Sequence, residues 1–156
     1  MKRFILIVLL SIATPAAAGG IAEFQALLDS QDTLEKKAIV CKRMWMVPTA
    51  VFELALRDKV ANGTLTKSNK LPNVVYQGQL RVLFLGELAR QKGLKDLVDA
   101  GFKASAGIGK EESRAFDEQC IKGVNKLMFS PQYKLMVDTL QSDATLFVEK
   151  ALRLEN

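Results

Sequence analysis

The stretch from Glu111 to Phe129 carries the clearest hydrophobic pattern in the chain, with apolar positions three or four residues apart. This spacing is typical of an amphipathic helix, because one face of an α-helix repeats every 3.6 residues. The remaining positions are mostly polar, which predicts one face toward a core and one toward water. The predicted inward face consists of Phe116, Cys120, Val124 and Leu127, with Ile121 and Met128 beside them.

An earlier segment repeats this pattern and contains the second of the two cysteines. Its predicted inward face consists of Leu34, Ala38, Cys41 and Trp45. Because both sulfurs would then point into one core, we predict a structural disulfide between Cys41 and Cys120, formed in an oxidising compartment. Two separate buried thiols or an intermolecular bridge are the alternatives. Met44 and Met46 flank Trp45; such a cluster can line a ligand pocket, but its helical spacing favours a place in the core.

The same helical period recurs along most of the chain, and no segment of five or more residues alternates between apolar and polar positions. This predicts a single compact all-α domain of about seven helices. A short amphipathic segment is expected first, at Ile21 to Asp29. The helices that follow are expected at Asp32 to Met46, Pro48 to Asn62, Val74 to Gln91, Leu94 to Lys103, Glu111 to Phe129, Ser130 to Leu140 and Ser142 to Leu152.

Local signals predict where several of these helices begin. Ser30 or Asp32 can cap the helix that carries Cys41, and Glu35 would complete a capping box with Asp32. Pro48 is expected in a first turn, where its missing N–H costs no hydrogen bond. The run from Leu80 to Leu85 is apolar nearly all round, which predicts that its helix is central and largely enclosed.

The longest polar connection, Gly63 to Asn73, contains few apolar residues and is expected to project from the domain. Projecting loops on a rigid scaffold often carry binding residues. The predicted partner-binding residues are therefore Thr64, Thr66, Lys67, Ser68, Asn69 and Lys70. Basic side chains also cluster as Lys36, Lys37, Lys42 and Arg43, and as Arg90, Lys92 and Lys95. We interpret these clusters as solvated faces, or alternatively as contacts for an acidic partner.

The first eighteen residues have the pattern of a secretory signal. Lys2 and Arg3 precede an apolar run, Phe4 to Ile12, that is too short to span a bilayer, and Pro15 precedes three alanines suited to cleavage. We predict a cleaved signal peptide over residues 1–18, a helical domain over residues 19–156 and a periplasmic location without a membrane span. A membrane anchor is the alternative. Loss of Lys2 and Arg3 would change the formal net charge from +5 to +3, which disfavours nucleic acid as a partner.

The chain contains no histidine, which excludes nucleophiles activated by histidine and haem attachment through Cys-x-x-Cys-His. We therefore predict no catalytic residue, no metal site and no cofactor. The run from Ala104 to Glu111 places glycines before a lysine, as phosphate-binding loops do, but no strand precedes it and we interpret it as a helix connection. Glu112 followed by Ser113 is reminiscent of lytic transglycosylases, so a lysozyme-like glycan-cleaving enzyme is a low-ranked alternative. A glutamate at a helix start is also favoured by the helix dipole.

Three short motifs support a family resemblance: Ala38-Ile39-Val40-Cys41 in an early helix, Gln119-Cys120-Ile121 in a late one, and the helix from Ser130 to Leu135. An exported all-helical chain with these motifs resembles the periplasmic immunity proteins that neutralise type VI secretion amidases. The resemblance implies an obligate binding function, often as a homodimer, with a protruding loop that blocks the cleft of the partner enzyme.

These observations predict an exported, non-enzymatic binding protein whose partner is another protein. The leading hypothesis is an inhibitor or immunity protein against a periplasmic cell-wall-degrading toxin. The alternative class is a structural or assembly component of an envelope secretion or conjugation machine.

Overall fold

The computed structural model of the protein describes residues 20–155, which contain eight α-helices and no strand. The α-helices are α1 (Ile21–Asp29), α2 (Leu34–Val40), α3 (Lys42–Ala61), α4 (Leu71–Gln91), α5 (Lys95–Ala104), α6 (Lys110–Ser113), α7 (Gly123–Met128) and α8 (Lys134–Leu152). Two 3₁₀ segments and one π segment join them: η1 (Arg114–Phe116), η3 (Pro131–Tyr133) and η2 (Glu118–Lys122). The predicted single all-α domain is confirmed. The predicted signal over residues 1–18 lies outside the described residues.

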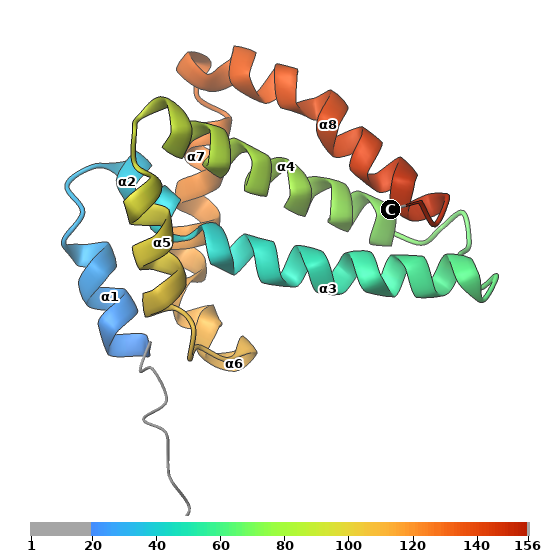
Figure 1. The fold of residues 1–156 in the computed structure, drawn as a ribbon, viewed down its shortest axis with the longest axis horizontal. Helices are drawn as coiled ribbons and strands as arrows, with labels where there is room; N and C mark the ends of the chain where they lie inside the picture. Colours follow the sequence, from blue (N-terminus) through green and yellow to red (C-terminus); the bar gives the residue numbers. More distant parts are fainter. Residues whose placement is uncertain (1–19, 156) are drawn as a thin grey trace, which may run out of the picture.

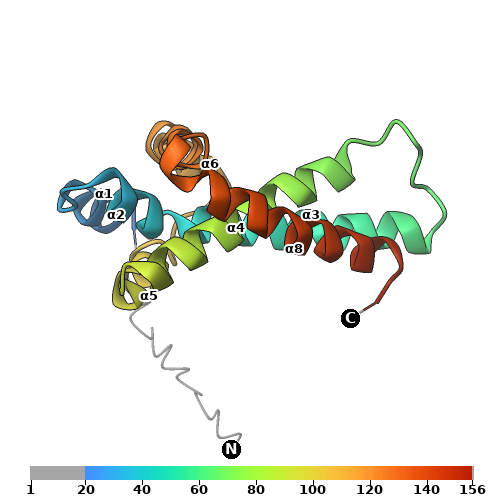
Figure 2. The ribbon, with the colours of Figure 1, turned by 90° about the horizontal axis from the view of Figure 1, so that it is seen from above.

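The helices fall into two groups (Figures 1 and 2). The long-helix group is α3, α4 and α8, in which α4 packs against α3 on one side and α8 on the other. The short-helix group is α1, α2, α5 and residues 110–128, gathered around the first half of α3 and the last turns of α4. The predicted central helix is therefore α4, whose buried side chains include Val75, Leu80, Phe84, Leu85 and Leu88.

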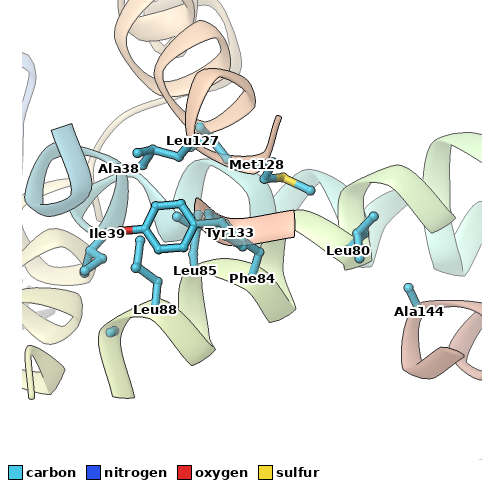
Figure 3. Close-up of a cluster of buried hydrophobic side chains, with 12 residues drawn as sticks. Ala38, Ile39, Leu80, Phe84, Leu85, Leu88, Leu127, Met128, Tyr133 and Ala144 are labelled. Carbon is cyan, nitrogen blue, oxygen red and sulfur yellow. The ribbon is translucent and has the colours of Figure 1, made fainter. Parts of the chain in front are cut away.

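The largest hydrophobic cluster joins both groups (Figure 3). Phe84 of α4 meets the Tyr133 ring edge-on, with 5.6 Å between ring centroids. The Tyr133 hydroxyl donates a hydrogen bond of 3.0 Å to a carboxylate oxygen of Glu35, which connects α2 to the segment before α8. A second cluster, in the short-helix group, packs Phe24 edge-on against Phe116 with 4.8 Å between centroids. The third cluster is the smallest and holds Leu56, Val75, Val148 and Ala151 of the long helices.

The disulfide lies in the second cluster. Cys41 and Cys120 are bonded, with 5.3 Å between their Cα atoms, and both are almost fully buried. The predicted pairing is thus confirmed, and the alternatives of free thiols or an intermolecular bridge do not hold. The bond connects the residue between α2 and α3 to the middle of η2, 79 residues later.

The predicted continuous helix from Asp32 to Met46 is wrong, because the chain breaks at Cys41. The helix α3 starts at Lys42 and continues to Ala61, so Pro48 lies inside it rather than in its first turn. The predicted caps Ser30 and Asp32 are also wrong: Thr33 is the N-cap of α2, and its hydroxyl oxygen accepts a 3.3 Å hydrogen bond from the Lys36 N–H. Tertiary packing of the disulfide against α5 overrides the local helical pattern at Cys41.

The predicted helix from Glu111 to Phe129 is interrupted by η1 and η2, although its apolar face is placed as expected. Phe116, Cys120, Val124 and Leu127 are all buried. Ile121 is instead 38% exposed, contrary to its predicted place beside this face, because the wider turn of the π segment changes the side-chain register.

The final two predicted helices are one continuous helix, α8. Ser142, predicted as a cap, lies in its middle, and its hydroxyl donates a 3.2 Å hydrogen bond to the Thr139 carbonyl. A serine can satisfy its hydroxyl in this way inside a helix, so the residue type alone did not indicate a boundary.

Candidate functional site

The predicted binding residues lie at the far end of the α3–α4 hairpin, in a connection that spans residues 62–70 (Figure 2). Thr64, Thr66, Lys67, Ser68 and Lys70 are exposed. The connection is shorter than the predicted Gly63 to Asn73 because α4 begins at Leu71. It is also better anchored than expected, since Leu65 packs against the third hydrophobic cluster and Asn69 Oδ1 accepts a 2.9 Å hydrogen bond from the Leu71 N–H.

A second candidate surface lies along α3, where residues 44–52 form an uncharged run of nine residues. A helix that is apolar on every side is usually enclosed by the protein core. Here α4 covers one side only, where Thr49 and Leu56 are buried. The rest of the surface of this helix leaves large apolar side chains in contact with water, from the edge of the α3–α4 contact to the side opposite α4. We call these residues the α3 surface: Met46, Val47, Val51, Phe52 and Leu54.

The exposure on the α3 surface is substantial. Val51 is 57% exposed and Leu54 is 66% exposed. In Figure 1 the side of α3 that faces away from α4 and α8 carries no long helix of the described chain. Isolated exposed apolar residues are ordinary, whereas a contiguous set on one helix marks an interaction surface. The α3 surface is thus the strongest structural indication of a docking site in residues 20–155.

Three hollows border the α3 surface, and Pro48 lines all of them. The α3–α6 groove, of about 270 Å³, lies between Val47 and Val51 on α3 and Ile108 and Lys110 beyond α5. Its wall is held in place by Arg43, whose guanidinium donates hydrogen bonds to the carbonyl oxygens of Ser105 and Ala106. A third hollow, of about 180 Å³, reaches from Met44 to Cys120.

The second hollow, which we call the Trp45 pocket, has a volume of about 220 Å³ and lies between α3 and α4. Trp45 and Phe52 come from α3, and Val74 and Arg81 come from α4. The Trp45 indole N–H donates a 3.1 Å hydrogen bond to the Cys120 carbonyl. The disulfide-bonded segment therefore fixes the orientation of the ring that forms one wall of this pocket.

Arg81 contributes a positive charge to the Trp45 pocket. Its guanidinium carbon lies 4.6 Å from the centroid of the Trp45 ring, within the range of a cation–π interaction. Its Nε donates a 3.0 Å hydrogen bond to Asn125 Oδ1, and its Nη1 donates to the Gln77 carbonyl at 2.7 Å. Burial lowers the pKa of Arg81, although an arginine stays charged at any physiological pH.

The other sequence-derived candidates do not gather into a site. Glu112 is exposed, and its Oε2 accepts a 2.7 Å hydrogen bond from the Gly109 N–H at the start of α6, which is the role of a helix cap. The run from Ala104 to Glu111 is a helix connection, as interpreted. In the basic clusters, Lys36 pairs with Asp32 and Arg90 pairs with Glu87, whereas Arg43 donates hydrogen bonds to backbone carbonyl oxygens.

Two further observations bear on the class of site. Within residues 20–155, no three side chains of histidine, cysteine, aspartate or glutamate come together as a metal site would require. Among the described helices, none combines the length and apolarity needed to cross a membrane.

Comparison of the chain with models of known protein families, with curated protein sequences and with solved structures finds no match.

The predicted place of the Trp45 cluster in the core is confirmed for Trp45 and Met44, which are half-buried and pack against the first and second hydrophobic clusters. It is wrong for Met46, which is 39% exposed. Spacing alone does not predict the α3 surface, because Pro48 also fits the start of a helix. The available signal was the length of the uncharged run: nine residues make two and a half turns, whereas a half-buried helix normally carries polar residues within that length.

Proposed function

We propose that this chain is an exported, non-enzymatic binding protein that inhibits a periplasmic cell-wall-degrading hydrolase, and that the hydrolase docks on the α3 surface. The observation that carries the proposal is the contiguous apolar face of α3, exposed in a domain whose other long helices pack against one another. Docked interfaces place apolar side chains at their centre and polar ones at their rim. The class of partner rests on the family resemblance described above.

The predicted loop suits the rim of the same interface. It follows α3 directly, and Asn62 lies ten residues after Phe52, which is about 15 Å along a helix. Lys67 and Lys70 are exposed there and can steer an acidic partner toward the apolar face. The loop and the α3 surface therefore form one extended candidate interface rather than two competing sites.

The test is inhibition of purified type VI secretion amidases, measured as release of soluble fragments from peptidoglycan. We expect the protein to inhibit at least one amidase at a one-to-one ratio. Val51→Asp places a charge in the docked face and should weaken inhibition at least tenfold, because a buried unpaired charge is costly. Leu146→Asp is the matched control, since Leu146 is 49% exposed on α8, on the other side of α4 from α3.

Three outcomes would overturn the proposal. The first is that no amidase is inhibited. The second is that the protein alone releases fragments and Glu112→Gln abolishes the release, which would establish the glycan-cleaving alternative. The third is a homodimer, seen by sedimentation, that Val51→Asp dissociates while Leu146→Asp does not, which would assign the α3 surface to a second copy of this chain.

A further inference from the structure

The charge of Arg81 lacks a counterion within the described chain. No carboxylate in residues 20–155 lies within ion-pair distance of its guanidinium, whereas Arg57, Arg90, Arg114 and Arg153 each pair with a glutamate. Arg43 also has no ion pair, but both of its terminal nitrogens donate to carbonyl oxygens. Arg81 is nevertheless half-buried, and its hydrogen bonds go to neutral amide and carbonyl oxygens. Partly buried charges are normally paired, because burial removes the water that would otherwise stabilise them.

The donors of Arg81 are also only partly used. A guanidinium has five N–H groups in one plane. The Nε and Nη1 groups face Asn125 and Gln77, and none of the hydrogen bonds within residues 20–155 comes from Nη2. These contacts and the Trp45 ring hold the plane of the guanidinium in place. A fixed cation with spare donors is well suited to bind a carboxylate.

The surroundings of Arg81 limit what can bind there. It is the one charged side chain among the residues that line the Trp45 pocket, and its neighbours on the wall include Trp45, Pro48, Phe52 and Val74. Thr49, Asn73 and Gln77 add uncharged polar groups to the lining. A single cation in a mainly apolar wall matches a singly charged group on an apolar stem. A phosphate carries more charge and more acceptor oxygens than one partly engaged guanidinium can serve.

We infer that the Trp45 pocket binds a carboxylate of the partner protein: an aspartate or glutamate side chain, flanked by apolar residues that cover the α3 surface, enters between α3 and α4 and pairs with Arg81. This inference rests on the proposed function and adds the chemistry by which the docked segment is recognised. The apolar face supplies buried area, and Arg81 fixes the position of the docked segment along α3. In any other position Arg81 and the acidic side chain of the partner would both be desolvated without a counterion.

The chain provides its own reporter for this site, since Trp45 is its single tryptophan. The experiment is a titration of Trp45 fluorescence with 3-phenylpropionate, an apolar carboxylate, and with its neutral amide, 3-phenylpropanamide. The carboxylate should bind saturably and about tenfold more tightly than the amide, because a charge-assisted hydrogen bond contributes at least this much in a partly buried site. Raising the salt concentration should weaken the binding of the carboxylate and leave the binding of the amide unchanged.

Two substitutions at Arg81 and one control complete the test. Arg81→Gln should remove the preference for the carboxylate while the amide still binds, and Arg81→Lys should keep part of it, because lysine retains the charge but not the planar fork. Arg90→Gln is the control, since Arg90 lies on the same helix but is exposed and paired with Glu87. If Arg81→Gln does not fold, the comparison of acid, amide and salt in the unaltered protein decides the question.

Equal binding of acid and amide, no saturable response, or a preference that survives Arg81→Gln would each overturn the inference. These results are distinguishable from failure of the proposed function, because the titration contains no partner protein. If Val51→Asp abolishes inhibition of an amidase but the titration shows no preference for the carboxylate, the surface docks its partner without an anchoring acid.

Discussion

The two ends of the molecule are built from helices of different length. Short helices surround the disulfide at one end: α1 has nine residues, α2 seven and α5 ten. The other end is formed by long helices: α3 has twenty residues, α4 twenty-one and α8 nineteen. Isolated helices as short as α1 and α2 are unstable in water, so their order depends on packing. The short-helix group has a core with two phenylalanines and the covalent bond. The long-helix group has the third cluster to itself, in which the four buried side chains are small or of medium size and no covalent bond joins the helices.

This difference explains how the protein can leave an apolar face uncovered. Long helices gain enough contact along their length that α3 can pack mainly on α4, with smaller contacts to α8, α5 and α2, and still leave part of its surface for a partner. In the short-helix group, Phe24, Leu28 and Phe116 are buried around Cys41 and Cys120, and the large apolar side chains that it exposes, Ile21 and Ile121, are single residues on different segments. The disulfide therefore stabilises the end that supports the candidate site, and the Trp45 bond to the Cys120 carbonyl connects the two.

Removal of the disulfide should have the largest effect on stability and should affect the short-helix group more than the long-helix group. Replacement of both Cys41 and Cys120 by alanine should lower the free energy of unfolding by about 4 to 5 kcal/mol, because the bond closes a loop of about 80 residues in the unfolded chain. Urea unfolding measures the loss. Amide hydrogen exchange should show that α1, α2 and α5 lose protection before α4 and α8 do. Equal loss in both groups would mean that the two ends do not differ in their dependence on the bond.

A methyl group at the α2–α5 crossing should have the next largest effect. In Gly101→Ala the added Cβ would lie 2.5 Å from the Val40 carbonyl oxygen and 3.0 Å from its Cα. Backbone atoms cannot rotate away, so α2 and α5 must separate, at a cost of about 1 to 3 kcal/mol in unfolding free energy. Thermal or urea unfolding measures the change.

Two glycines of α4 serve as comparisons for Gly101. A Cβ at Gly78 would lie 2.2 Å from Thr49 Oγ1, a side-chain atom that can turn away by giving up its hydrogen bond to the Trp45 carbonyl, so Gly78→Ala should cost less than Gly101→Ala. A Cβ at Gly86 would meet only the mobile end of Lys42 at 3.2 Å. Gly86→Ala should therefore stabilise the fold by about 0.5 to 1 kcal/mol through helix propensity. The reverse order of Gly78→Ala and Gly101→Ala would contradict the expectation that the backbone contact between α5 and Val40 yields less than the side-chain contact between α4 and Thr49.

The hydrogen bond between Tyr133 and Glu35 should have the smallest effect and a defined pH dependence. The pKa of Glu35 is lowered, first by a backbone N–H hydrogen bond and also by the Tyr133 hydroxyl, against the opposing effect of burial. A carboxyl whose pKa is lowered on folding contributes stability above its unfolded pKa and loses that stability as the pH falls through its folded pKa. Tyr133→Phe should cost about 1 kcal/mol at pH 7.

The cost of Tyr133→Phe should begin to shrink as the pH falls below the unfolded-state pKa of glutamate, about 4.3, and should go on shrinking as the pH falls through the lower folded-state pKa of Glu35. Urea unfolding at pH 7 and at pH 3 measures this change. Tyr133→Phe is also made in a protein that carries Glu35→Gln. There the loss of the Tyr133 hydroxyl should have the same cost at both pH values, because residue 35 no longer titrates. A constant cost at both pH values in the single variant would show that the hydroxyl stabilises the fold through other contacts.

Much of the fold could be predicted from hydrophobic spacing. The period of 3.6 residues placed helices along the described domain and identified α4 as one long helix, but it divided both α3 and α8 in two. The inward face of Phe116, Cys120, Val124 and Leu127 is buried as predicted. The Cys41–Cys120 bond followed from two such faces and an even cysteine count, because buried faces converge on a core. Interruptions within helices were not predictable: the π segment at Cys120 and the break at Cys41 arise where the bonded segments must fit one another.

The amino-acid sequence by itself determined the helical class, the buried stripes and the covalent pair, because these depend on side-chain type and on spacing along a regular helix. Only the tertiary structure decided which apolar side chains remain uncovered. Residues 44–52 carry no charge on any side, and the packing of α3 on α4 and its smaller neighbours leaves Val47 and Val51 largely in water. The position of Arg81 over Trp45, without a carboxylate beside it in the described residues, likewise depends on how α3 and α4 cross, which no local pattern encodes.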